Sequence, residues 1–187
     1  MSVRFVLAIA KIHDLDIKVI AFVLAFPQAN FDVDVYMEIT AGMVLENGHC
    51  ILYVLKLNKA LYGLKQAPAN WYEMLSKGLI DRGVKYSEVD PCMFISNKTF
   101  VLVYVDDCTV ISRKHGFVDN FIHSLNHGSD NFKFTKEDSL ENYVGVKFVD
   151  YDKGDKFEMK QPFLTERIIE SPGFEQRMTN SQSTPAA

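Results

Sequence analysis

The sequence of 187 residues lacks the marks of several protein classes. Its three cysteines, Cys50, Cys92 and Cys108, are far apart and form no Cys-x-x-Cys pair, and its histidines are scattered singly, which argues against zinc or a disulfide framework. The most apolar stretch, Ile17 to Phe26, is about half as long as a membrane span and contains Lys18. The first residues do not resemble a signal peptide. We expect an intracellular protein, cytoplasmic or nuclear, that is neither secreted nor membrane-bound.

An excess of positive charge is also lacking. The chain has 20 Lys and Arg against 24 Asp and Glu, a net charge of -4, so a nucleic acid would have to bind at a local basic patch. Hydrophobic residues make up 48% and charged residues 24%, which excludes a disordered, collagen-like or coiled-coil chain. The length suits one folded domain, and nothing indicates an oligomeric state.

The hydrophobic pattern predicts interleaved helices and strands. Apolar residues at helical spacing predict helices over 3–10, 71–79, 118–125 and from Pro162 to Ser171. Alternating or continuous apolar runs predict strands over 17–26, 31–39, 51–57, 94–96, 100–105, 108–112, 143–151 and 157–160. Because hairpins join many of these strands, we expect the α+β class, a mainly antiparallel sheet with helices packed on one face. Residues 178–187 are polar and predict a disordered tail.

Two adjacent carboxylates, Asp106 and Asp107, lie between the apolar runs 100–105 and 108–112, where we predict an Asp106-Asp107 hairpin turn. Turn chemistry alone explains them, because Asp is common in tight turns. Alternatively, the hairpin presents carboxylate oxygens to a hard divalent cation, as phosphoryl transfer requires. On these residues alone, both interpretations stay open.

Several segments in the same order resemble the reverse transcriptase of copia-type long-terminal-repeat retrotransposons. Tyr104-Val105-Asp106-Asp107 resembles the metal-binding motif of that family, and the run from Lys56 to Pro68, followed by Trp71-Tyr72, resembles its KLxKALYGLKQAPRAWY block. Further matching segments are 3–8, 22–29, 35–38 and 143–146. The resemblance implies a polymerase palm-like fold over residues 1–177, without the fingers and most of the thumb, and RNA-directed DNA polymerase activity.

The resemblance also implies site residues. Asp106 would be a ligand of a two-metal Mg²⁺ site, supported by Asp107, and both would be catalytic. Phe26, Tyr62 and Gly63 would contact the nucleotide, although core packing explains Phe26 equally well and Gly63 could be an ordinary loop glycine. The implied partners are an RNA or DNA template-primer and deoxynucleoside triphosphates.

One position departs from the family. Ala21 stands where the family has the first metal-binding Asp, and a methyl group cannot coordinate a cation. Asp16 is no substitute, because five residues along a strand place it on the opposite face and roughly 16 Å away. We therefore expect a truncated and catalytically impaired polymerase. The alternatives are a non-enzymatic module that binds nucleic acid or a partner, and a decayed element with no selected role.

A basic stretch surrounds the second matching block. Its cations are Lys56, Lys59, Lys65, Lys77, Arg82 and Lys85. They predict either a strip for a nucleic-acid backbone or a solvated helix face. We expect Trp71 to pack in the core rather than stack on a base.

Overall fold

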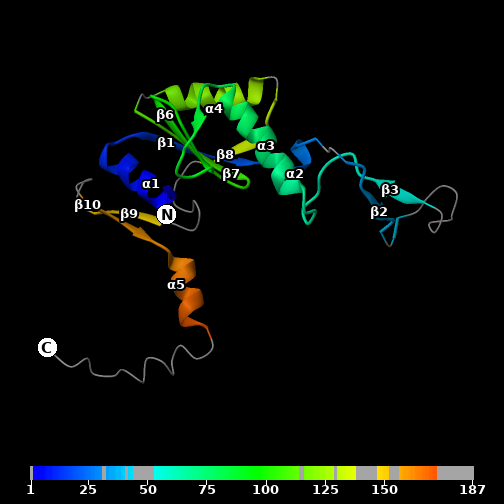
Figure 1. Cartoon of the computed structure of the whole chain (residues 1–187). Coiled ribbons are helices and arrows are strands. Elements are labelled where there is room, and N and C mark those ends of the chain that lie inside the picture. The colour runs from blue at the N-terminus through cyan, green and yellow to red at the C-terminus, as the bar shows by residue number, and fades with distance from the viewer. Residues whose placement is uncertain are drawn as a thin grey trace. The chain divides into compact units, whose positions relative to one another are not determined.

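The computed structural model describes residues 2–30, 33–40, 42–43, 53–113, 116–128, 130–137, 147–151 and 156–171. The chain divides into two compact units, Met1–Lys136 and Glu137–Ala187 (Figure 1). The predicted domain end at 177 and the predicted tail lie outside the described residues and stay predictions.

The first unit contains a six-stranded sheet in the order β4-β5-β6-β7-β1-β8. These strands are β1 (Asp16–Phe22), β4 (Lys85–Tyr86), β5 (Met93–Ile95), β6 (Thr99–Tyr104), β7 (Asp107–Ser112) and β8 (Phe134–Glu137). The pairings β4·β5, β5·β6, β6·β7 and β7·β1 are all antiparallel. The prediction of an α+β chain with a mainly antiparallel sheet is therefore confirmed.

Two small hairpins account for the remaining strands in the described ranges. In the first unit, β2 (Tyr36–Glu38) pairs with β3 (Val54–Lys56), so both strands are shorter than predicted over the described residues. In the second unit, β9 (Lys147–Tyr151) pairs with β10 (Lys156–Lys160), and α5 (Pro162–Ile169) follows. The predicted hairpin and helix of this unit are confirmed where they are described, whereas residues 143–146 lie outside the described ranges.

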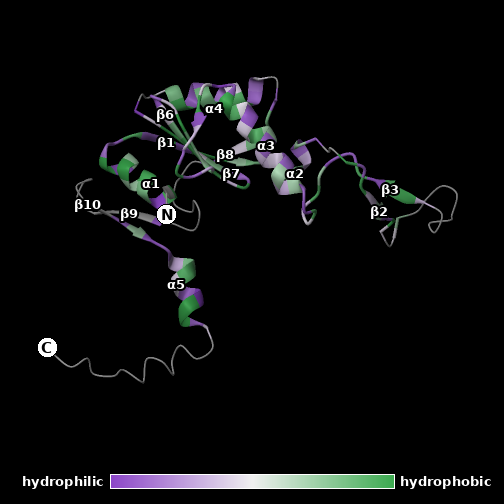
Figure 2. Ribbon diagram, in the orientation of Figure 1, coloured by the Kyte–Doolittle hydropathy of each residue, from purple (hydrophilic) through white to green (hydrophobic). Residues whose placement is uncertain are grey.

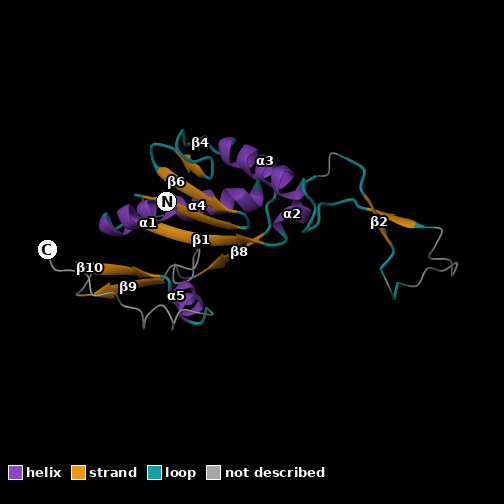
Figure 3. Ribbon diagram, turned by 60° about the horizontal axis from the view of Figure 1, so that its bottom comes forward, coloured by secondary structure: helices purple, strands orange, loops and turns teal. Residues whose placement is uncertain are grey.

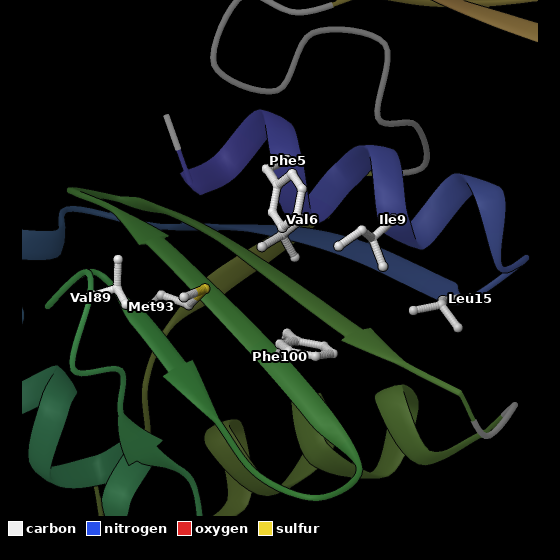
Figure 4. A pocket seen from close by; sticks show the side chains of 7 residues that line it. All are labelled: Phe5, Val6, Ile9, Leu15, Val89, Met93 and Phe100. Carbon is white, nitrogen blue, oxygen red and sulfur yellow. The ribbon is translucent and has the colours of Figure 1, made fainter.

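The helices of the first unit cover both faces of the sheet (Figures 3 and 4). They are α1 (Ser2–Ile12), α2 (Ala25–Gln28), α3 (Ala67–Ile80) and α4 (Phe117–His127). Buried residues of α3 and α4 join one core cluster with Val101 and Val103 of β6. On the opposite face, α1 lies over Phe100. The prediction that helices pack on one face is wrong for α1. In the described part of the chain, no helix combines the length and apolarity of a bilayer span.

The composition of β6 explains why both faces are covered. Successive strand residues point to opposite faces, and β6 is apolar at Phe100, Val101, Leu102 and Val103 alike (Figure 2). A strand that is apolar on both faces must be covered on both faces. The cover by α1 is incomplete and leaves an apolar hollow of about 270 Å³, lined by Phe5, Val6, Ile9, Leu15, Val89, Met93 and Phe100 (Figure 4).

Aromatic rings fill the core between the sheet and α3. Phe22, Trp71 and Phe132 contact one another edge to face, with ring centroids 5.0 to 6.0 Å apart. Gly78 of α3 makes room for this cluster, since an added Cβ would lie 2.6 Å from the Phe132 ring. Trp71 is 2% exposed, so its predicted place in the core is confirmed.

The largely buried side chain of Arg82 forms hydrogen bonds to the carboxyl ends of both α3 and α4. Its side chain is 11% exposed and forms an ion pair of 3.1 Å with Asp130. Its guanidinium also donates to the carbonyl of Gly78 and to the carbonyl and hydroxyl of Ser124. An added Cβ at Gly128 would collide with this guanidinium. Arg82 is therefore a structural residue, and including it in a basic strip was wrong.

Candidate functional site

The β6–β7 hairpin turns at Val105 and Asp106. Tyr104 pairs with Asp107, so Asp107 is the first residue of β7 and the predicted Asp106-Asp107 turn is wrong by one position. Burial fixes this register, because Val103 and its partner Cys108 both join the core that faces α3 and α4. Slipping β7 by one residue would turn Cys108 out of that core.

Backbone hydrogen bonds hold this turn from two sides. The indole Nε1–H of Trp71 donates to the Val105 carbonyl at 2.7 Å, and the Phe22 amide donates to the Asp106 carbonyl at 2.7 Å. Val105 has φ 56°, in the left-handed region that a β-branched residue rarely adopts. A two-residue hairpin with positive φ at its first position usually has Gly there. The turn is therefore a strained geometry that the surrounding fold holds in place.

The register also brings Ala21 beside the acidic pair. Ala21 of β1 is the direct partner of Asp107, and its neighbour Phe22 bonds to Asp106. Directly opposed residues of an antiparallel pair point to the same face with their Cβ atoms roughly 5 Å apart. Asp16 pairs with Ser112 at the other end of β1, which agrees with its exclusion as a substitute ligand. Position 21, where the resemblance implies a metal-binding Asp, thus lies next to Asp107 and carries a methyl group.

The described carboxylates do not by themselves complete a metal centre. Across the described ranges, no three His, Cys, Asp or Glu side chains are grouped so that they could hold a metal ion. Magnesium in phosphoryl-transfer sites is bound by one or two carboxylates together with substrate phosphates and water. Asp106 and Asp107 suit one such ion. They do not suit a two-ion arrangement that also needs a carboxylate at position 21.

The predicted nucleotide-binding residues lie together. Phe26 of α2 is buried, and its ring centroid is 4.4 Å from that of Tyr62, which is half exposed. Gly63 has φ 97°, and the Leu64 amide donates to the Leu61 carbonyl. Gly63 is the third residue of this turn, and a turn with positive φ at its third residue favours glycine there. The backbone conformation alone therefore explains the glycine. The ring contact places Phe26 beside Tyr62, and contact with a nucleotide stays a prediction.

The segment between β1 and α2 was not anticipated from the sequence. The predicted long strand ends at Phe22, because Leu24 with φ 50° turns the chain into α2. Gln28 stabilises this turn: its Nε2 donates to the carbonyls of Val23 and Lys133, and its Oε1 accepts from the Lys133 amide. Gln28 therefore fixes where Phe26 lies relative to the end of β1.

The basic stretch is not one continuous strip. Lys56 forms an ion pair of 2.6 Å with Asp34, and its hydrogen bond lowers the pKa of that carboxyl. Lys59 donates to Asn30, and Arg82 is largely buried. A role in contacting a nucleic-acid backbone stays a prediction for the exposed residues Lys56, Lys59, Lys65, Lys77 and Lys85.

Cys108 offers a chemical test of this geometry. It is fully buried beside Asp107, and burial raises the pKa of its thiol to about 12. Because the thiolate is the reactive form, we expect iodoacetamide at about pH 8 to modify exposed Cys92 while leaving Cys108 untouched until denaturant is added. Peptide mass spectrometry resolves each cysteine. Equal rates at Cys92 and Cys108 in the folded chain would contradict the described burial.

Comparison with known proteins gives consistent matches. Residues 1–187 match the family described as reverse transcriptase (RNA-dependent DNA polymerase). The chain is 28% identical over 191 residues to the Retrovirus-related Pol polyprotein from transposon TNT 1-94 of Nicotiana tabacum, covering 100% of this chain and 14% of the relative. It is 32% identical over 150 residues to the corresponding polyprotein from transposon RE1 of Arabidopsis thaliana, covering 78% and 10%. Identity to the Transposon Ty1-DR4 Gag-Pol polyprotein of Saccharomyces cerevisiae is 28% over 121 residues, covering 62% and 8%. The chain thus spans 14% or less of each of these relatives.

Proposed function

The chain belongs to the reverse transcriptase family as a copia-type domain, and from this premise we propose that it is the palm of an RNA-directed DNA polymerase whose two-metal site is impaired by Ala21. The observation that carries the proposal is the pairing of Ala21 with Asp107, beside the turn that presents Asp106. The substrates would be a template-primer and deoxynucleoside triphosphates.

Each residue of the site has a distinct role in this proposal. Asp106 would bind Mg²⁺ with support from Asp107, and the bound ion would stabilise the charge that develops during transfer of the nucleotide. Phe26 and Tyr62 would form an aromatic wall against the incoming nucleotide. Gly63 would let the backbone approach nucleotide and template closely.

The impairment follows from the chemistry of position 21. The resemblance implies a two-metal centre that takes one carboxylate from the first strand and one from the hairpin. The β1 position supplies only a methyl group. Electrostatic stabilisation of the developing charge is commonly the largest contribution to such catalysis, so losing a ligand affects the chemical step directly.

Manganese binding tests the site itself. We expect Ala21→Asp to bind Mn²⁺ at least tenfold more tightly than the native chain, because changes that merely orient a metal ligand already alter affinity roughly 10- to 100-fold. Asp106→Ala in the Ala21→Asp chain should abolish the gain, as measured by electron paramagnetic resonance of free Mn²⁺. Asp16→Ala is the matched control, since it removes a carboxylate at the far end of β1. Equal affinity of the native and Ala21→Asp chains would refute the proposed site.

A second candidate function is a nucleic-acid-binding module without catalysis. Ala21 favours it, because the position beside Asp107 lacks a carboxylate while Phe26 and Tyr62 are in contact with each other. Salt-sensitive binding of a primer-template by the native chain, without extension, would support the module, since neutralised phosphates release counterions. No binding at low salt would leave the interpretation of a decayed element.

A further inference from the structure

Trp71 joins helix α3 to the turn that carries Asp106. It is the only tryptophan of the chain and is almost fully buried. Its indole Nε1–H donates to the Val105 carbonyl at 2.7 Å. Its ring packs edge to face on Phe22 with centroids 5.0 Å apart, and the Phe22 amide donates to the Asp106 carbonyl. One side chain thus contacts the turn directly and also contacts the strand residue that holds the turn from the other side.

The hydrogen-bonded carbonyl belongs to the peptide group that precedes Asp106. This peptide group sets ψ of Val105 and φ of Asp106, the two dihedral angles that determine how Asp106 is oriented in the turn. Val105 has φ 56°, which is unfavourable for a β-branched residue, so the turn would relax toward another geometry without external bonds. The hydrogen bond from the Trp71 indole to the Val105 carbonyl opposes this relaxation, which would displace the Asp106 carboxylate.

We propose that Trp71 is a positioning residue that sets the orientation of Asp106 through the Val105 carbonyl; the role of that orientation in metal binding rests on the proposed function. Core packing alone does not explain the choice of tryptophan. Trp71 already lies among the rings of Phe22 and Phe132, where a phenylalanine would also supply apolar surface. A phenylalanine has no N–H to give to Val105, whose carbonyl would lose a buried partner.

The experiment compares Trp71→Phe with Leu79→Ala, both in the full Ala21→Asp chain labelled with ¹⁵N. Leu79 is a buried residue of the same helix and core cluster, so its truncation destabilises α3 without removing a bond to the turn. We expect Trp71→Phe to accelerate hydrogen exchange of the Asp106 and Asp107 amides relative to other β7 amides. The Mn²⁺ dissociation constant should rise roughly tenfold, as for loss of an outer-sphere contact. In Leu79→Ala, the relative exchange rates of the Asp106 and Asp107 amides and the Mn²⁺ dissociation constant should stay as they are in the Ala21→Asp chain. The free energy of unfolding should fall.

A measurement that needs no substitution at Trp71 accompanies this comparison. The single indole N–H signal of the native chain should exchange slowly with solvent, because it is buried and bonded to Val105. Fast indole exchange, or turn amides that respond equally to Trp71→Phe and Leu79→Ala, would overturn the positioning role. If the Ala21→Asp chain binds no Mn²⁺, the proposed function fails, and the exchange data alone then decide whether Trp71 holds the turn.

Discussion

Primer extension with Mg²⁺ is expected to be roughly 10²- to 10³-fold faster in the Ala21→Asp chain than in the native chain, the range seen when one group that stabilises transition-state charge is removed or restored. The reason is geometric: position 21 is the direct strand partner of Asp107, and the adjacent Phe22 amide bonds to Asp106. A carboxylate introduced there lies directly opposite Asp107, next to the turn that contains Asp106. A labelled primer on an RNA template, resolved on a denaturing gel, measures the rate.

Two further variants make this comparison specific. Asp106→Ala in the Ala21→Asp chain should extend no primer, because the hairpin ligand is then lost. Asp16→Ala in the same chain should extend at the parent rate, since Asp16 pairs with Ser112 away from the turn. Rapid extension by the native chain would show that Ala21 does not limit the reaction.

Replacing Arg82 with Ala is expected to lower the free energy of unfolding by about 3 kcal/mol, the scale for breaking a buried ion pair from one side. The substitution leaves Asp130 without its cation and removes the donors to the Ser124 and Gly78 carbonyls. The carboxyl ends of α3 and α4 then lose their shared anchor. Urea unfolding followed by circular dichroism measures the change.

The control for this prediction lies on the same helix. Lys77→Ala removes an exposed cation of α3 and should change stability by no more than about 0.5 kcal/mol. The free energy of unfolding of Arg82→Lys should lie between those of Arg82→Ala and Lys77→Ala, because an ammonium keeps the charge but cannot reproduce the planar fork of donors. Equal stability of Arg82→Ala and Lys77→Ala would mean that Arg82 is only a surface cation.

The spacing of apolar residues in the sequence predicted many of the helices and strands of the first unit. The stripes of α1, α3 and α4 and the strands β6 and β7 lie where apolar spacing places them, since burial dictates both the spacing and the fold. We did not predict from the sequence that α1 covers the opposite face of the sheet, although the unbroken apolar run in β6 indicates that both faces are covered. The α+β class was instead expected to place all helices on one face.

Local backbone geometry was harder to predict. Asp is a better turn residue than Val, so propensity favoured an Asp106-Asp107 turn, whereas long-range packing of Val103 and Cys108 decides the register. Likewise, Leu24 is not a residue that signals a left-handed turn, and the Gln28 bonds to Val23 and Lys133 that stabilise it join segments far apart in sequence. The Trp71–Val105 bond has the same non-local character.

The pairing of position 21 with Asp107 has a consequence for how such a site is retained by evolution. Like charges directly opposite each other in a sheet destabilise it by up to about 1 kcal/mol, so a metal-free chain with Asp at this position would fold less stably than the chain with Ala21. Losing the ligand therefore brings no folding penalty. Selection on folding alone would therefore not restore the aspartate, and under the proposed function only a requirement for metal binding would keep it at position 21.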